Sequence, residues 1–307
     1  MVRGVHGEKI VSAIESDKMP KADIPRLKEA LKRYDLWVEQ LQEAEAETLD
    51  GLVEKMVTCL NEYKLYLDLN LIFDSEEDFL YRQKGQLKLD NTVIEEFMPI
   101  FVKKCIEKVE GSCNVEVSSQ ISTFSSVYFA SSLSNPNLGG GINIKTRDQD
   151  FSMSRKLYLQ SSYDPEFNPD KTVKLETHLG YILAEMKTNL DKTMFQEASA
   201  TAHDIKQAVT GAKYYLLCDF LDMTPISTTT TDIDEILIVR KAKRISSNIR
   251  KEFSTKTGRN KWREWYAKYL NENPYSAEIF GRFVNHIISQ MKNEELIEES
   301  VLEVGYF

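Results

Sequence analysis

The chain has 307 residues, of which 42% are hydrophobic and 28% are charged, a balance typical of a soluble globular protein. It contains no run of about 18 apolar residues, so a membrane-spanning helix is not expected, and residues 1–9 lack the apolar core of a secretory signal. The four cysteines and four histidines are dispersed, which argues against a zinc site and favours free thiols in a cytoplasmic protein.

The first 112 residues are expected to form a helical region. Apolar side chains recur at helical spacing over residues 24–41 and again over residues 49–71, each time opposite a charged face. A further amphipathic helix is predicted over Thr92–Glu110, where Pro99 either kinks the helix or marks its start. From this helix Glu95 or Glu96 can approach a neighbouring site, although a surface carboxylate is the ordinary interpretation.

Residues 113–245 change character, because β-prone segments alternate with strong chain breakers. The triple glycine Gly139–Gly141 is expected to mark a boundary between layers or a close backbone approach, and no Gly-Lys-Ser/Thr follows it as in a phosphate loop. A helix is predicted over residues 190–209. Strands are predicted at 142–144, 151–159, 172–177, 181–188, 214–221 and 234–240. The predicted fold class is a mixed α/β sheet flanked by helices.

The segment Asn168–Thr188 is predicted to be a β-hairpin that turns at Leu179-Gly180. Alternation along the second strand places Glu185 and Lys187 on one face, and the fold-back brings Asp170 to the same rim. Two carboxylates suit a Mg²⁺ ion, and a nearby ammonium can position the water that attacks a phosphodiester. These three are the candidate catalytic residues, while a plain surface ion pair between Glu185 and Lys187 stays the alternative.

Asp150 is the rival of Asp170 as a metal ligand. It also opens a strand, and it comes within reach of the metal if that strand neighbours the hairpin. The hairpin geometry favours Asp170. From the helix that follows, Gln196 or Glu197 can reach the same site.

The last region, residues 246–307, is expected to be helical, basic and aromatic. The chain as a whole carries a net charge of −9, yet Arg240–Lys268 holds eleven basic residues against two acidic ones. Such a segment predicts contact with DNA phosphates, or else a solvated helix whose aromatic side chains belong to the core. The candidate DNA contacts are Arg250, Lys251, Arg259, Lys261, Arg155 and Lys156.

Pro169-Asp170, followed by Glu185-Met186-Lys187, resembles the PD-(D/E)xK signature of many type II restriction endonucleases. Residues 148–158 and 184–194 are similar to the Bpu-type (BbvCI-like) restriction endonucleases, which are built from two dissimilar subunits. The resemblance implies Mg²⁺-dependent cleavage of double-stranded DNA, one catalytic centre in this chain, and a metal held by Asp170, Glu185 and the Met186 carbonyl. It also implies a second subunit, although a homodimer stays open. A structure-specific repair nuclease and a non-enzymatic helical interaction protein are the alternative functions.

Overall fold

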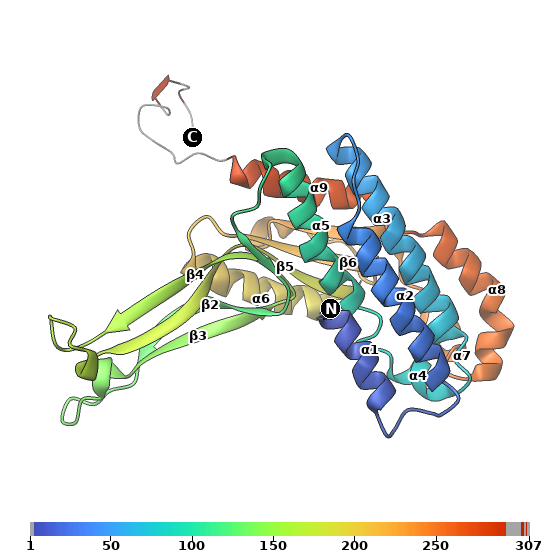
Figure 1. The fold of residues 1–307 in the computed structure, drawn as a ribbon, viewed down its shortest axis with the longest axis horizontal. Helices are drawn as coiled ribbons and strands as arrows, with labels where there is room; N and C mark the ends of the chain where they lie inside the picture. The colour runs from blue at the N-terminus through green and yellow to red at the C-terminus, as the bar shows by residue number, and fades with distance from the viewer. Residues whose placement is uncertain (1–2, 293–301, 304, 306–307) are drawn as a thin grey trace.

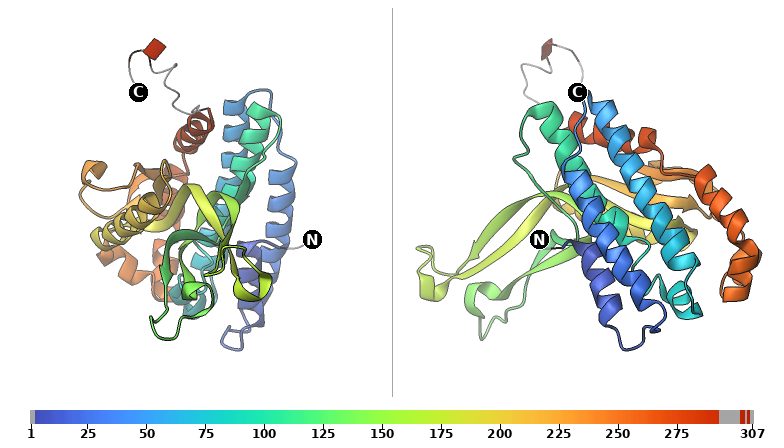
Figure 2. Two further views of the ribbon diagram at one scale, coloured as in Figure 1. Left: turned by 90° about the vertical axis from the view of Figure 1, so that its left-hand side faces the viewer. Right: turned by 45° about the vertical axis from the view of Figure 1, so that its right-hand side comes forward.

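The protein consists of a helical body from which a narrow β-arm projects (Figure 1). The computed structural model describes residues 3–292, 302–303 and 305. Two further views show the arm leaving the body on one side (Figure 2). Within this described part, no helix combines the length and the apolar character needed to cross a membrane.

The N-terminal region is helical, as the apolar spacing predicts. Thr48 caps one helix, since its hydroxyl accepts a 3.1 Å hydrogen bond from the Gly51 amide. The helix containing Pro99 begins at Thr92 and runs through the proline to Glu110, so Pro99 does not mark its start. The elements are α1 (Val5–Glu15), α2 (Ile24–Gln42), α3 (Leu49–Leu65), the π-helical η1 (Tyr66–Phe73), α4 (Asp78–Gln83) and α5 (Thr92–Glu110).

A seven-stranded mixed sheet follows, which confirms the predicted fold class. Three of its strands, β5, β6 and β7, run parallel in that order, and the other neighbouring pairs are antiparallel except for a single parallel contact between β2 and β5. The strands are β1 (Glu116–Ser118), β2 (Ile121–Phe129), β3 (Ile142–Gln149), β4 (Phe151–Ser161), β5 (Val173–Leu190), β6 (Lys213–Leu221) and β7 (Glu235–Lys243).

Four helices complete the described chain: α6 (Lys192–Ala208), α7 (Ser247–Glu252), α8 (Lys256–Glu272) and α9 (Ala277–Met291). The last of them ends at Met291, and residues 293–301 of the region expected to be helical lie outside the described part. The division at residues 112 and 245 stays a prediction. The helix-to-sheet changes lie near those positions, but one hydrophobic cluster joins the N-terminal helices, the sheet and α9.

The sheet is buried on both faces inside the body. One face packs against the N-terminal helices and α9, through Ala184 and Met186 of β5. The opposite face packs against α6, through Leu183 of β5 and Phe195 of the helix. Since neighbouring residues of a strand point to opposite faces, Glu185 and Lys187 lie on the α6 side, opposite to the buried Ala184 and Met186.

The predicted hairpin over Asn168–Thr188 is wrong, because β5 runs as one strand from Val173 to Leu190. Gly180 does not turn the chain. It lies at a β-bulge, where the pairing shifts from Met153 with Ile182 to Ser154 with Gly180. A Cβ on Gly180 would lie 2.6 Å from the side chain of Leu183, so the glycine serves close packing.

The arm consists of two side-by-side hairpins, β2–β3 and β4–β5 (Figure 1). The triple glycine lies at the tip of the first hairpin and not at a layer boundary. Gly139, Gly140 and Gly141 have φ angles of 56°, 69° and 62°, a conformation that favours glycine. The tips touch, because the Ser161 hydroxyl donates a 2.8 Å hydrogen bond to the Gly139 carbonyl.

Candidate active site

Two carboxylates meet where β4 begins beside β5. Phe151 pairs with Ala184 in the antiparallel register, so the next positions along the two strands are Asp150 and Glu185. The Oδ2 atom of Asp150 accepts a 2.8 Å hydrogen bond from the backbone amide of Met186. This bond fixes the Asp150 carboxylate against the strand that carries Glu185.

Lys187 completes the group. Its Nζ atom lies 2.6 Å from Oε1 of Glu185, and both side chains are about three-quarters buried or more. On the other side of Glu185, the Tyr214 hydroxyl donates a 3.1 Å hydrogen bond to Oε2. Glu185 is therefore held between an ammonium on its own strand and a phenol on β6.

Burial and the neighbouring charges shift the pKa values of Asp150 and Lys187. Burial raises the pKa of Asp150, and the negative charge of Glu185 adds to this, while the Met186 amide and Lys187 oppose it. Burial disfavours the charged form of Lys187, but its hydrogen bond to Glu185 and the charges of Glu185 and Asp150 outweigh burial and raise the pKa of the ammonium. A cation beside Asp150 and Glu185 would stabilise both carboxylates.

A third carboxylate, on α5, is close enough to be affected by the charge of Asp150. Glu95 is buried, and its Oε2 atom accepts a 2.9 Å hydrogen bond from Gln120. Burial raises the pKa of Glu95, and the charge of Asp150 raises it further. Of the two glutamates considered from the sequence, Glu95 is the one that approaches this group.

Glu96 serves the fold of the N-terminal helices. Its Oε2 atom accepts hydrogen bonds from the His6 and Gly7 amides at 2.8 and 3.3 Å, and the Tyr34 hydroxyl donates to Oε1 at 2.5 Å. From α6, Glu197 is close enough for its charge to raise the pKa of Lys187, although its side chain lies at an exposed position.

Asp170 does not join this group. It lies in a short 3-10 turn, Pro169–Lys171, at the far tip of the arm. Beyond this turn, twelve residues of extended strand, from Val173 to Glu185, span roughly 40 Å at the rise of a β-strand. The prediction that placed Asp170 beside Glu185 is wrong, because it depended on a turn at Gly180, and Asp150 occupies the predicted position instead.

The donor set fits a Mg²⁺ ion. Asp150 and Glu185 supply hard carboxylate oxygens, which this ion prefers. The described residues contain no group of three or more His, Cys, Asp or Glu side chains arranged around one ion. Mg²⁺ does not need such a cage, since it usually keeps several waters and binds through one or two carboxylates.

Tyr214 is the site residue that sequence reasoning missed. Its position in an apolar strand predicts a core residue, and it is indeed buried. Burial raises the pKa of its hydroxyl, and the adjacent Glu185 adds to this, so the phenol stays protonated and donates to the carboxylate. The available signal was that a buried tyrosine needs a hydrogen-bond partner.

Arg259 contradicts its prediction as a DNA contact, because its side chain is 1% exposed and is bound within the protein. Its guanidinium donates 2.8 and 3.2 Å hydrogen bonds to the carbonyls of Phe73 and Phe253 and pairs with Asp78 at 3.1 Å. Two further donations, of 3.2 and 3.1 Å, reach the carbonyls of Ser75 and Glu77. Arg259 therefore ties α8 to the turn that follows η1.

The basic segment as a whole is largely neutralised by the rest of the fold. Arg240 is buried between Asp68 and Asp219, and Arg263 pairs with Asp74 at 2.8 Å. Carboxylates also lie within ion-pair distance of Lys241, Arg244, Lys256, Lys261 and Lys268. A local charge count along the sequence overstates the positive surface, because the acidic partners come mostly from distant segments.

The remaining DNA-contact candidates stay predictions. Lys251 and Lys261 are exposed on the surface of α7 and α8. Arg155 and Lys156 are exposed on β4 within the arm, where Lys156 pairs with Glu176 at 2.9 Å. Arg250 is partly buried, and its Nε atom donates a 2.9 Å hydrogen bond to the Ile245 carbonyl.

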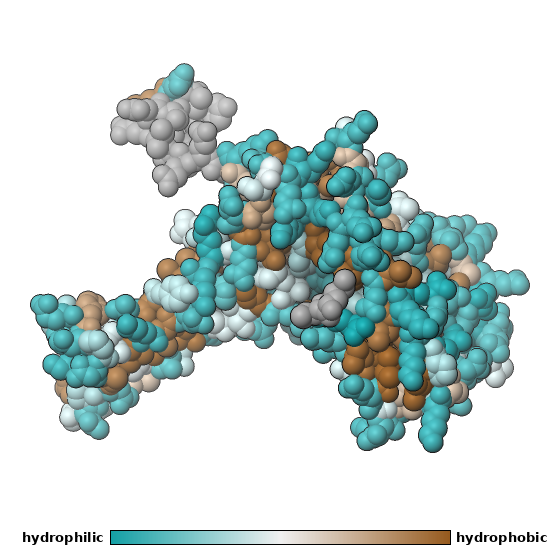
Figure 3. Space-filling model, in the orientation of Figure 1, coloured by the Kyte–Doolittle hydropathy of each residue, from teal (hydrophilic) through white to brown (hydrophobic). Residues whose placement is uncertain are grey.

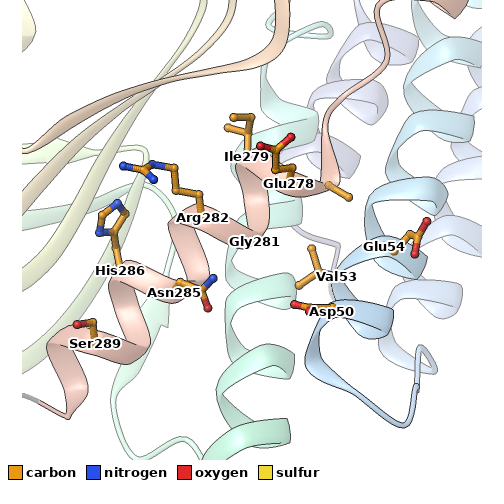
Figure 4. Close-up of a pocket in the computed structure, with 11 residues that line it drawn as sticks. Asp50, Val53, Glu54, Glu278, Ile279, Gly281, Arg282, Asn285, His286 and Ser289 are labelled. Atoms are coloured by element: carbon orange, nitrogen blue, oxygen red, sulfur yellow. The ribbon is translucent and has the colours of Figure 1, made fainter.

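A cavity of about 710 Å³ lies away from this group, between the start of α3 and α9 (Figure 4). Two of its charged side chains share one partner. Arg282 binds Glu235 through two nitrogens at 2.8 and 2.7 Å, and His286 lies 2.7 Å from the same carboxylate. Glu235 opens β7, so these contacts fasten α9 to the amino ends of the parallel strands and create no reactive group.

Comparisons with known proteins bear on the family and the fold of the chain. The family model of the Bpu10I restriction endonuclease matches residues 86–307. Among solved structures, the chain is similar to one described as the native BbvCI A2B2 tetramer, with a TM-score of 0.52 and 14% sequence identity over 86% of this chain and 96% of that chain. At that identity the likeness shows the fold alone. No curated protein matches the chain.

Proposed function

We propose that this chain, which belongs to the Bpu10I restriction endonuclease family, is a type II restriction endonuclease subunit that uses Mg²⁺ to cut one strand of a specific double-stranded DNA site. The observation that carries the site assignment is the pairing of Asp150 with Glu185 across β4 and β5, beside Lys187. Membership of the family supports the nuclease activity. What we add to it is the Mg²⁺ ion, the residues that hold this ion, and the cleavage of a single DNA strand.

Asp150, Glu185 and the Met186 carbonyl would hold the ion. When bound, Mg²⁺ supplies electrostatic stabilisation of the charge that builds up on a phosphodiester during hydrolysis. Lys187 stays protonated in this environment, so its role is to position the attacking water and balance charge. Tyr214 keeps the Glu185 carboxylate in place from the neighbouring strand.

The test compares two aspartates. Asp150→Asn should lower the rate of Mg²⁺-dependent plasmid cleavage by at least about 100-fold, since it removes a ligand worth several kcal/mol of transition-state stabilisation. Asp170→Asn, at the arm tip, is the matched control and should cut at the wild-type rate. EDTA should stop both. Loss of cutting in Asp170→Asn with normal cutting in Asp150→Asn would refute the assignment, and random degradation in place of discrete fragments would favour a structure-specific nuclease.

A second endonuclease subunit is part of the proposal. The solved BbvCI structure is an A2B2 tetramer. The arm of the present chain exposes large apolar side chains along its length (Figure 3). They are Val127, Tyr128, Phe129, Leu133, Leu138, Tyr158, Tyr163 and Phe167. Such a patch on a soluble protein marks an interaction surface. With its partner, this chain should convert supercoiled plasmid to linear DNA, and with a catalytically inactive partner it should stop at the nicked circle.

A further inference from the structure

A second cavity lies at the carboxyl ends of the three parallel strands. In open sheets with parallel strands this edge is where ligands bind. The cavity measures about 510 Å³, within the range of small-molecule sites. Residues from the ends of β5 and β6 and from just beyond β7 contribute to its wall, namely Asn189, Phe220 and Arg244. The segment between α4 and α5, together with α7 and α8, encloses the remainder.

The cavity is positively charged. Arg82, Lys84, Arg244 and Arg250 line it, and Asp90 is the one carboxylate among the lining residues. Three of these cations have carboxylate partners, because Arg82 pairs with Asp78, Lys84 with Asp90 and Arg244 with Asp222. Arg250 has no carboxylate within ion-pair distance among the residues that the structure describes. Its Nη atoms are thus the donors available to an anion.

Aromatic rings and one unpaired amide form the rest of the wall. Phe220 stacks on Tyr269 with ring centres 5.9 Å apart, and Phe253 lies 5.4 Å from Tyr266. The Oδ1 atom of Asn91 is buried and lacks a hydrogen-bond donor within the described structure. A ligand that carries a phosphate, a planar ring and a hydrogen-bond donor could bind Arg250, the aromatic rings and the Asn91 oxygen, respectively.

The cavity adjoins the candidate active site through two segments of chain. On β5, Asn189 lies two residues beyond Lys187, roughly 7 Å along the strand. From the other side, Asn91 precedes the first turn of α5, and on that helix Glu95 is close enough for the charge of Asp150 to raise its pKa. A chain of nucleotides cut at Glu185 and Lys187 therefore has a neighbouring unit within reach of the cavity.

We propose that this cavity binds one nucleotide of the DNA strand next to the position of cleavage, with its phosphate on Arg250 and Arg244 and its sugar and base against the aromatic wall. The inference rests on the proposed nuclease function. Arg250 was already a candidate DNA contact from the charge run, and what the inference adds is the enclosed cavity, its aromatic wall and the position of that cavity beside the site of cleavage.

The test measures duplex DNA binding by fluorescence anisotropy, with Ca²⁺ in place of Mg²⁺, as a function of salt. Arg250→Gln should weaken binding about tenfold and reduce the slope of log affinity against log salt by about 0.9, the value of one phosphate contact. Arg33→Gln is the control, because Arg33 is an exposed arginine of α2 that pairs with Glu29 outside the cavity. It should change affinity less than about twofold. Equal effects of the two variants would overturn the inference.

Asn91→Asp tests the cavity without removing a structural contact. Asp suits the N-cap position that Asn91 occupies, so the variant should fold, while its charge should repel a phosphate and weaken binding about tenfold or more. Unchanged affinity in both cavity variants, with normal cutting by the wild type, would refute the cavity alone. A wild type that neither binds nor cuts DNA would refute the nuclease function as well. Tight binding of a free deoxynucleoside monophosphate would assign the cavity to a free ligand and also overturn the inference.

Discussion

Replacing Arg259 by Gln separates a structural arginine from a DNA contact. The substitution removes the ion pair with Asp78 and leaves four backbone carbonyls without the guanidinium donor. The pair itself contributes little, because the Asp78 side chain is 34% exposed and keeps Arg82 as a partner. Each buried carbonyl left without a donor costs about 1–3 kcal/mol unless water or the new amide reaches it. We expect a total loss of about 4–6 kcal/mol in the free energy of unfolding, since the shorter side chain satisfies part of the set.

Urea unfolding followed by circular dichroism measures this loss. With an m value of about 3 kcal/mol/M, the midpoint should fall by about 1.3–2 M. Lys261→Gln is the matched control on the same helix, since its side chain is 65% exposed and its partner Glu252 lies 3.5 Å away. Its stability should change by less than about 0.5 kcal/mol. An Arg259→Gln variant as stable as the wild type, with a reduced salt dependence of DNA binding, would show that the buried network has been misinterpreted.

Two other residues give sharp expectations. His6 is buried between Thr92 and Tyr63, at 2.9 and 3.1 Å, and burial followed by the charge of Lys64 lowers its pKa to about 3. Below pH 6.5 the imidazole takes up a proton in the unfolded state but not in the folded state, so the free energy of unfolding should fall by about 2 kcal/mol between pH 7 and pH 5. Urea titrations at the two pH values measure this fall, and His6→Gln should remove it. Tyr214→Phe loses the hydrogen bond to Glu185, so its cleavage rate should fall about tenfold while far-ultraviolet circular dichroism stays unchanged, and a wild-type rate would exclude a positioning role.

The helices were predictable because their signal is local. Apolar spacing located α2, α3, α5 and α6 within a few residues of their observed ends. The pairing of Glu185 with Lys187 was equally predictable, since alternation along any strand puts them on one face. These inferences needed no knowledge of which segments lie side by side.

The errors came from features that depend on the whole fold. A glycine between two β-prone runs predicts a turn, but Gly180 serves a bulge that the neighbouring strand imposes. That single difference moved the carboxylate partner of Glu185 from Asp170 to Asp150. Arg259 was misjudged for a similar reason, because its acceptors lie about 180 residues earlier in the chain. Neither contact leaves a mark in the local sequence.

The continuity of β5 has a mechanical consequence. A single strand carries both the arm tip, at Val173, and the reactive group, at Glu185 and Lys187. Twelve residues, roughly 40 Å, separate Val173 from Glu185. Gly180 lies seven residues, roughly 23 Å, from Val173, so a rotation of about 5° at the bulge would displace the tip by roughly 2 Å. Conversely, a partner subunit that binds the arm tip would restrict the orientation of the strand that carries Glu185 and Lys187 without contacting these residues.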